Sequence, residues 1–353
     1  MPHFLETLYE AQKIAFAPFL FKAVSAALQT EFLPGVVHQK TPKTPHEWAE
    51  TLGLTPYAVD VMTDILVGAR VLARREDGTL ESTRVGDLLV LDEMTRVNFF
   101  FTDRTNYAGL EKTLDALLEG RPAGLSAFNG DWKTIYPHLP DLPEDAQKAW
   151  FAFDHFHSDR AYRAAIECLD KLKGFSHLVD IGGNTGRFTK LFLETHPNAR
   201  ATFVDLPAQI ENLARHAELA AVRDRIDTVA IDWLTDAPLT GTEEADLYWM
   251  SQFLDCFSLD EARSILLRTA RAMKAGAKLA VLEPLVDEQR HEAAALSLAA
   301  TSLYFTVMAN GNSRFFHGDE LRRLFAESGL RIVSETPNLG ISHTFFILEK
   351  DSK

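Results

Sequence analysis

Cysteine is scarce in this chain of 353 residues. It occurs only as Cys168 and Cys256, which lie far apart in the sequence. A disulfide framework of the kind that holds small secreted domains together is therefore excluded. The scarcity is typical of a protein in a reducing compartment, and we predict a cytoplasmic location.

Positive charge is also scarce. The 36 lysines and arginines face 50 aspartates and glutamates, which gives a formal net charge of −14. Such a field repels phosphate backbones and anionic lipid headgroups. We therefore expect neither nucleic acid nor a membrane surface as a partner.

Long apolar runs are missing as well. The most apolar N-terminal stretch, AQKIAFAPFLFKAVSAAL, contains Lys13 and Lys22. It has neither an uninterrupted signal-peptide core nor an 18-residue membrane span. The overall hydrophobic content of 46% is that of an ordinary globular protein. The length favours a soluble chain of two or three domains.

The apolar residues near the N-terminus are spaced as on a helix over residues 4–30. The apolar stripe is broad and aromatic, more than one small domain needs to cover. Large apolar patches rarely stay exposed on a soluble protein. We therefore expect this helix to pack against a second copy of the chain in a homodimer.

Residues 44–86 have the pattern of a helix-turn-helix followed by a hairpin wing. Thr44 and Glu47 have capping-box spacing, and a turn is expected at Asp77-Gly78. The second helix carries Asp60 and Asp64, where a DNA-reading helix needs basic or amide side chains. A winged-helix-like dimerisation domain over residues 1–100 is thus favoured over a DNA reader.

The remaining residues, 101–353, predict a helical connector and then an α/β domain. The connector is rich in aromatic residues that could wall a pocket. From residue 176 the pattern alternates strand and helix, and it closes with two strands at 331–336 and 343–350. Alternation of this kind predicts an open, mostly parallel sheet with helices on both faces.

A glycine-rich segment, VDIGGNTGRF, joins the first strand of this domain to its helix. Glycines allow a tight turn and a close approach of a ligand to the backbone. Asn184 replaces the middle glycine of the usual pattern, and asparagine tolerates positive φ better than most residues. The third glycine comes too early for a pyrophosphate loop, so a nucleoside cofactor without phosphate fits better.

Acidic residues end the next two strands. Asp205 could accept both ribose hydroxyls, and Asp232 with Trp233 could hold an adenine. Either aspartate could also be a simple loop or capping residue. Ligands of such sheets bind outside the carboxyl ends of the strands, which favours the cofactor interpretation.

The chain resembles the S-adenosylmethionine-dependent small-molecule O-methyltransferases of the caffeate and hydroxyindole type. The segments that carry the resemblance are DIGGNTG, VDLP, IDW, WMSQFLDCFSLDEARSIL, LAVLEP and NGNSRFFHGDELRRLFAESGL. The resemblance implies a Rossmann-like class I methyltransferase sheet, S-adenosylmethionine as cofactor and a small aromatic substrate. The cofactor-binding residues that follow from it are Asp180, Gly182, Gly183, Asp205, Leu206, Asp232, Trp233 and Ser251.

The catalytic part of the family pattern is altered. The position of the usual catalytic histidine holds Asp255, and one supporting acid is present as Glu283. The second supporting acid falls near Ser313 and is absent. Ser258 and Glu261 already form a capping box for the next helix, so capping does not explain Asp255. It could be a solvated loop residue or a catalytic base.

An unperturbed Asp has a pKa of about 3.9 against about 10 for a phenol, so it is a weak base. Apolar neighbours and the charge of Glu283 could raise its pKa. His155 and His157 are alternative bases, and we expect His155, Phe156 and Gln252 to contact the substrate. No metal site is predicted.

Three chemical outcomes remain open. O-methylation of a hydroxylated aromatic metabolite is favoured, and C-methylation of a phenolic ring or N-methylation is the alternative. A third is a relative that binds the cofactor without transferring its methyl group, including a non-catalytic regulatory protein. Whether a carrier protein presents the substrate is also open.

Overall fold

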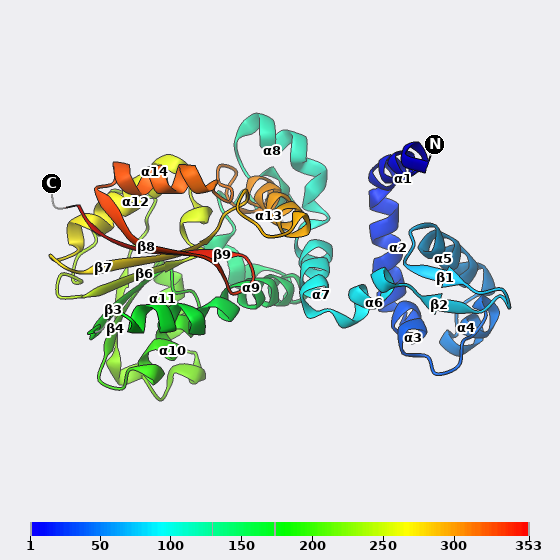
Figure 1. Ribbon diagram of the computed structural model, residues 1–353, viewed down its shortest axis with the longest axis horizontal. Coiled ribbons are helices and arrows are strands. Elements are labelled where there is room, and N and C mark those ends of the chain that lie inside the picture. The colour runs from blue at the N-terminus through cyan, green and yellow to red at the C-terminus, as the bar shows by residue number, and fades with distance from the viewer. Residues whose placement is uncertain (1, 129, 173, 352–353) are drawn as a thin grey trace. The chain divides into compact units, whose positions relative to one another are not determined.

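The computed structural model describes residues 2–128, 130–172 and 174–351. The chain divides into two compact units, Met1–Asp103 and Arg104–Lys353 (Figure 1). Each unit has a hydrophobic core of its own, with Phe32, Leu66 and Leu80 among the fully buried residues of the first.

The N-terminal unit is mostly helical. Its elements are α1 (Pro2–Ala15), α2 (Ala17–Gln29), α3 (Phe32–His38), α4 (Pro45–Leu52), α5 (Pro56–Gly68), β1 (Leu72–Arg74), β2 (Leu80–Ser82), α6 (Arg84–Leu91) and α7 (Glu93–Phe100). The expected capping box is confirmed at the start of α4, where Thr44 and Glu47 each bond to the other's backbone N–H.

The single helix expected over residues 4–30 is wrong. The chain forms α1 and α2, which meet at an angle of 72°. Pro18 lies in the first turn of α2. Proline has no N–H and its ring clashes with the preceding helical turn, so a helix can begin there but cannot run through it.

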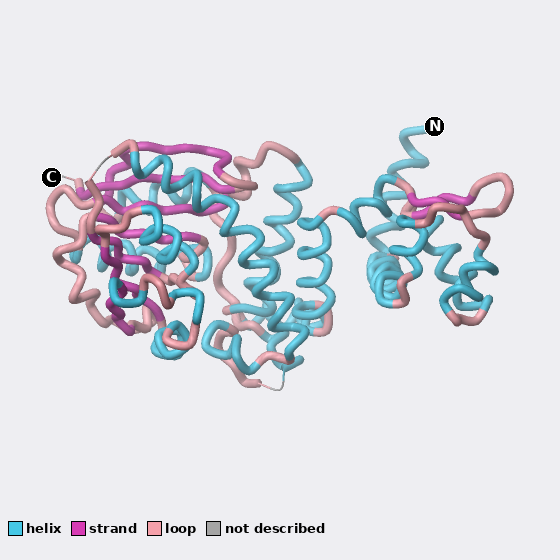
Figure 2. Tube along the Cα trace, turned by 90° about the horizontal axis from the view of Figure 1, so that it is seen from below, coloured by secondary structure: helices cyan, strands magenta, loops and turns pink. Residues whose placement is uncertain are grey.

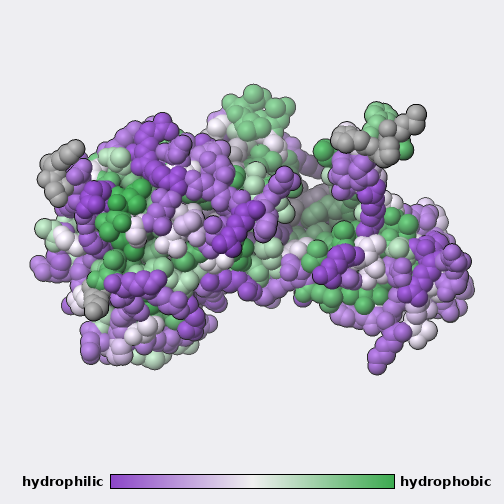
Figure 3. Space-filling view, viewed as in Figure 1, coloured by the Kyte–Doolittle hydropathy of each residue, from purple (hydrophilic) through white to green (hydrophobic). Residues whose placement is uncertain are grey.

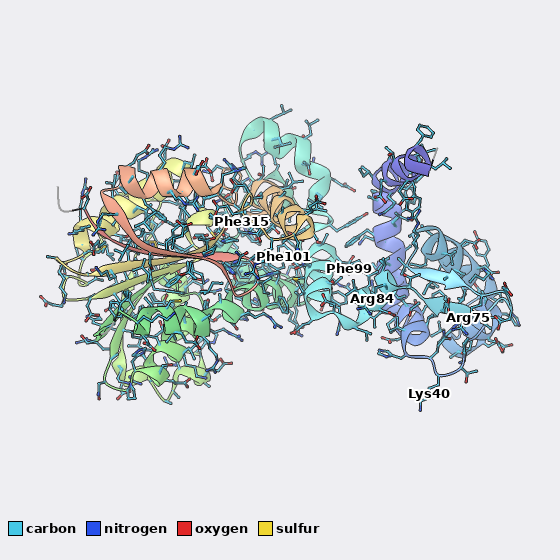
Figure 4. The ribbon with its side chains drawn as sticks, in the orientation of Figure 1. Lys40, Arg75, Arg84, Phe99, Phe101 and Phe315 are labelled. Carbon is cyan, nitrogen blue, oxygen red and sulfur yellow. The ribbon has the colours of Figure 1, made fainter. Side chains whose placement is uncertain are left out.

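The helical pair α4–α5 is followed by the antiparallel β1–β2 hairpin, which is the order of elements expected for a helix-turn-helix and wing. The winged-helix assignment itself stays a prediction. The arginines of the wing have acidic partners: Arg74 lies 3.9 Å from Asp64, and Arg75 is 2.6 Å from Glu81. Lys40, by contrast, extends into solvent from the segment after α3 (Figure 4). The paired arginines leave the wing little free positive charge for a phosphate backbone.

The C-terminal unit is built on a seven-stranded sheet within the described residues, in the order β5-β4-β3-β6-β7-β9-β8. Its strands are β3 (His177–Ile181), β4 (Arg200–Asp205), β5 (Ile226–Ala230), β6 (Leu247–Ser251), β7 (Lys278–Pro284), β8 (Leu330–Leu339) and β9 (His343–Lys350). The first five are parallel, and β9 is antiparallel to both β7 and β8. The predicted mostly parallel sheet with a closing hairpin is confirmed.

Helices cover both faces of this sheet (Figure 2). On one face lie α9 (Glu144–Asp170), α10 (Arg187–Thr195) and α11 (Pro207–Leu213), packed over Trp249 and Phe203. On the other lie α12 (Leu259–Ala272) and α14 (Gly318–Glu327), packed over Tyr248 and Phe346. Strand order reverses between β3 and β6, which is where sheets of this type hold their ligands.

Further helices lie before, between and after these elements in the chain. They are η1 (Phe101–Asn106), η2 (Gly109–Lys112), α8 (Thr113–Glu119), η3 (Ala123–Phe128), η4 (Tyr136–Asp141), η5 (Ala217–Leu219), η6 (Arg223–Arg225), η7 (Leu254–Cys256), α13 (Glu292–Tyr304) and η8 (Phe305–Ala309). On α8, Leu114, Leu117 and Leu118 are exposed and form an apolar patch visible in Figure 3.

One continuous helix, Glu292–Ala309, is long and apolar enough to cross a membrane, with 28% of its residues buried. The bent pair α1–α2 would pass the same test only if taken as one span. Within the helix, Tyr304 is buried and its hydroxyl accepts a hydrogen bond from Trp150, so this end is part of the unit's interior. The absence of a membrane partner stays a prediction.

Candidate functional site

The glycine-rich segment forms a tight loop between β3 and α10. Gly182 and Asn184 have φ of 71° and 52°, the left-handed region that glycine and asparagine tolerate. A side chain at Gly182 would collide with the ring of Phe253, which lies against the loop. In the sequence Phe253 counts only as an apolar neighbour of Asp255, and its contact with the loop was not foreseen because it joins segments far apart in the chain.

Asp205, at the end of β4, is tied to this loop. Its carboxylate accepts hydrogen bonds from the backbone N–H of Asn184 at 2.9 Å and of Leu206 at 2.7 Å. Burial raises the pKa of Asp205 to about 6. A carboxylate has about four acceptor sites, so two remain for the ribose hydroxyls that the sequence analysis assigned to it.

Asp180 has a different environment. It is buried and accepts a hydrogen bond from the hydroxyl of Thr189 on α10. Its carboxyl group also lies directly beneath Gly183, and burial raises its pKa to about 7. The side chain therefore braces the loop from below, and its contact with a cofactor stays a prediction.

Asp232 and Trp233 follow β5. Asp232 is exposed, and its carboxylate accepts from the backbone N–H of Leu234 at 3.0 Å. Trp233 is buried, with its ring edge-on to Phe253 and the guanidinium of Arg268 4.8 Å above its centroid. A ligand could reach Asp232 directly, whereas Trp233 would act mainly through Phe253.

Ser251 and Gln252, at the end of β6, each present a buried oxygen that accepts or donates no hydrogen bond within the described residues. Gln252 also has φ of 45°, which costs energy for a residue other than glycine. Asn184 Oδ1 is buried and unpaired in the same way. Unpaired buried polar atoms are rare in proteins and are typical of a ligand site.

Asp255 is neither exposed nor a helix cap. It lies in η7 with 1% of its surface exposed, next to Glu283 of β7 with 0%. The expected capping box is confirmed, since Ser258 and Glu261 cap α12 between themselves. The solvated-loop interpretation of Asp255 is therefore wrong.

The ionisation of each carboxyl group depends on the other. Asp255 Oδ2 and Glu283 Oε2 are buried and have no hydrogen-bond partner within the described residues. Burial raises the pKa of both, and the charge of Asp255 raises that of Glu283 further. Glu283 Oε1 accepts from the backbone N–H of Phe253 at 3.0 Å and of Leu254 at 2.9 Å, which fixes its position. Two carboxyl groups that interact in this way lose their protons as a pair rather than independently.

Other residues hold the 255 segment in place. The Cys256 thiol donates to Asp255 Oδ1 at 3.4 Å, and the Asn310 amide donates to the Cys256 carbonyl. Ser313, where the family's second acid is absent, donates to Asn310 Oδ1 at 2.9 Å. The serine thus helps to hold Asn310, which in turn holds the segment that carries Asp255. Asn310 is a residue that the sequence analysis missed.

Aromatic residues lie next to the carboxyl pair. Trp150 Nε1 donates to Tyr304 at 2.8 Å. The charge of Asp255 raises the pKa values of Tyr136 and Tyr304, although burial is the larger cause in both. The expectation that the connector walls a pocket stays a prediction.

The two histidines lie elsewhere. His155 is 3.3 Å from the Thr185 hydroxyl of the glycine loop, and burial lowers its pKa to about 4. His157 packs on Phe153, and burial lowers its pKa to about 4 as well. Phe156 lies 4.1 Å beneath the guanidinium of Arg160. These contacts give His155, Phe156 and His157 structural roles. Substrate binding by His155 and Phe156, and the role of either histidine as a base, stay predictions.

The site therefore suits a nucleoside that has no phosphate and carries a positive charge. Asp205 offers acceptors for a sugar, unpaired polar atoms line the strand ends, and the carboxyl pair lies at the neighbouring strand β7. A nearby cation favours ionised carboxylates, so a sulfonium would offset the burial that now raises their pKa.

Comparison with known proteins agrees with this geometry. The model of the O-methyltransferase domain family matches residues 146–331. Pluviatolide O-methyltransferase from Sinopodophyllum hexandrum is 28% identical over 50% of this chain, a match spanning 45% of that relative's length. Aclacinomycin 10-hydroxylase RdmB from Streptomyces purpurascens is 27% identical over 76% of this chain and 70% of its own.

Among solved structures, the mitomycin 7-O-methyltransferase MmcR superposes with a TM-score of 0.72 at 18% identity, covering 99% of both chains. At that identity the likeness shows the fold, and the predicted Rossmann-like methyltransferase architecture is confirmed. The family model covers more than half of the sequence and includes the glycine loop, Asp205, Asp255 and Glu283. The chain belongs to the O-methyltransferase domain family.

Proposed function

We propose that this protein is an S-adenosylmethionine-dependent methyltransferase acting on a small, hydroxylated aromatic metabolite, with oxygen as the favoured acceptor. The observation that carries the proposal is the buried pair formed by Asp255 of η7 and Glu283 of β7, near enough to Tyr136 and Tyr304 for the charge of Asp255 to act on both tyrosines. Family membership supports methyl transfer as the reaction.

Each feature of the site has a task in this proposal. Asp205 holds the ribose, while Ser251 and the glycine loop position the rest of the cofactor. When bound, the cofactor supplies an electrophilic methyl group. The carboxyl pair orients the substrate hydroxyl and takes its proton as the oxygen attacks.

C-methylation is a second candidate, because a carboxyl pair replaces the usual histidine. A phenolic ring carbon can attack the methyl group while Asp255 holds the hydroxyl, and its proton leaves late. C-methylation therefore needs a weaker base than the deprotonation of a phenol, whose pKa is about six units above that of an ordinary Asp. N-methylation makes a similarly small demand on the base.

A relative without methyl transfer is the third candidate. It rests on the same altered pair and on the hydroxylase among the related proteins. In that case the cofactor would bind but stay intact, and the site would use its positive charge alone. A regulatory role without turnover would leave bound cofactor intact as well.

Host extract incubated with methyl-labelled cofactor separates these candidates. Label in a product whose fragmentation places it on oxygen supports the proposal, and label on carbon or nitrogen supports the second. Tight cofactor binding, measured by calorimetry, without labelled product on extracts or phenol panels supports the third. Failure to bind the cofactor would overturn all three.

We also propose a cytoplasmic homodimer with a winged-helix-like first domain. The apolar residues Phe4, Leu5, Ile14, Phe16 and Phe19 are more than half exposed in the single chain. Such surface is typical of an interface between subunits. Sedimentation would test it: the double variant Phe4→Ser/Phe19→Ser should dissociate, and an unchanged dimer would contradict this interface.

A further inference from the structure

Asp154 of α9 is held at the glycine loop by a contact that the proposed function does not use. Its Oδ2 accepts a hydrogen bond from the side-chain amide of Asn184 at 3.0 Å. The backbone N–H of Asn184 donates to Asp205. One loop residue therefore connects Asp154 to the carboxylate assigned to the ribose.

The electrostatic surroundings of Asp154 call for a cation. Burial raises the pKa of Asp154 to about 7, and the negative charges of Asp159 and Asp255 oppose its ionisation further. Arg187 favours the ionised form, but this guanidinium is itself paired with Asp159. A cationic group of a ligand placed beside Asp154 would be attracted by a carboxylate with little competing positive charge.

The position of Asp154 matches one part of the proposed cofactor. The sugar is assigned to Asp205 at the end of β4, and the methyl group to the side of Asp255, after β6. Strand β3, whose end carries the glycine loop, lies between those two strands. The amino-acid branch is bonded to the same sulfur as the methyl group and the sugar, so in a bound cofactor it would extend toward the loop and the α9 residue hydrogen-bonded to it.

We propose that Asp154 binds the α-ammonium group of the cofactor, with Asn184 as the positioning residue that orients its carboxylate. This inference rests on the proposed function and assigns a contact to a residue outside the sequence prediction. A carboxylate–ammonium hydrogen bond adds affinity for the cofactor and its demethylated product alike, since both carry the ammonium.

The test compares three ligands by calorimetry. S-adenosylhomocysteine carries the ammonium, its deaminated analogue lacks only that group, and 5′-methylthioadenosine lacks the whole amino-acid branch. Asp154→Asn should weaken binding of the first about tenfold, the size expected of a charge-assisted hydrogen bond, and leave the other two unchanged. Asn184→Gly, which keeps the positive φ available, should show the same selectivity.

Two controls make the outcome specific. Glu167→Gln removes an exposed acid from the same helix and should bind all three ligands as the parent does. Asp205→Ala should weaken all three, because all contain the ribose. Unchanged binding of methylthioadenosine also reports that the Asp154→Asn variant is folded.

Equal affinity of parent and Asp154→Asn for S-adenosylhomocysteine would overturn the inference, as would an equal loss for all three ligands. Neither result would contradict the proposed function, which does not depend on Asp154. If the parent protein itself fails to bind S-adenosylhomocysteine, the proposed function is overturned and the inference with it.

Discussion

Replacing Asp255 by asparagine tests the carboxyl pair most directly. The amide has nearly the same shape as the carboxyl group, but it cannot ionise. Glu283 keeps its two backbone donors, the N–H groups of Phe253 and Leu254. The variant should therefore fold and bind the cofactor within about twofold of the parent, while losing one member of the proton-accepting unit.

The expected loss in turnover follows from the pKa gap. A phenol near 10 and an ordinary Asp near 3.9 differ by about six units, or about 8 kcal/mol at ~1.36 kcal/mol per unit. Burial raises the pKa of Asp255, which reduces that penalty. General-base assistance contributes about 10²–10⁴-fold, and a base that is still weak belongs at the lower end, so we expect about a hundredfold loss.

Single-turnover transfer from labelled cofactor, measured from pH 5 to 9, is the assay. The rate of the parent should rise with pH as the carboxyl pair loses its proton. The rate of Asp255→Asn should not show this rise. Asp260→Asn, a largely exposed acid five residues along, is the matched control and should behave as the parent. Parent-like rates and an unchanged pH profile in Asp255→Asn would refute the catalytic assignment.

Three further predictions concern cofactor binding, the pH dependence of stability, and the hydrogen bond by which Asn310 holds the segment that carries Asp255. Asp205→Ala should weaken S-adenosylhomocysteine binding about a hundredfold by calorimetry, since two hydrogen bonds to a charged group are lost; unchanged affinity would refute the ribose assignment. Both carboxyl groups of the pair have pKa values raised by folding, so the folded state binds more protons and stability should fall as pH rises above about 4. Asp255→Asn should thus unfold at a higher temperature than the parent at pH 8 but not at pH 4, and equal differences at both would contradict this. Asn310→Ala, which removes the donor to the Cys256 carbonyl, should lower turnover about tenfold while Asn312→Ala does not, and equal effects would count against a specific support.

The sheet was predictable because each of its strands carries a local signal. Short apolar runs such as LYWM in β6 are bounded by polar residues, and capping boxes mark helix starts at Thr44 and Ser258. The break between α1 and α2 was the main error, since the apolar periodicity continues across it. There a single proline outweighed a pattern spread over many residues.

Contacts within the site were less predictable. Asp205, Asp255 and Glu283 could be named because each follows or ends a strand in a recognisable motif. Phe253 against Gly182, Asn310 against Cys256 and Asp154 against Asn184 join distant segments. No periodicity reports such contacts, because side-chain direction at a loop depends on the tertiary fold.

The substitution of histidine by Asp255 is best understood together with Ser313. A histidine beside two acids becomes a stronger base, because both negative charges stabilise its protonated form, whereas an aspartate there would add a third negative charge. With Ser313 donating to Asn310 instead, one acid fewer faces Asp255, and a single proton can be shared with Glu283. The two departures from the family pattern therefore compensate each other electrostatically. Placing an acid at this position by Ser313→Glu should raise the pKa of the pair further and slow turnover at neutral pH. In Asp255→His, by contrast, Glu283 is already present as the acid that supports the histidine.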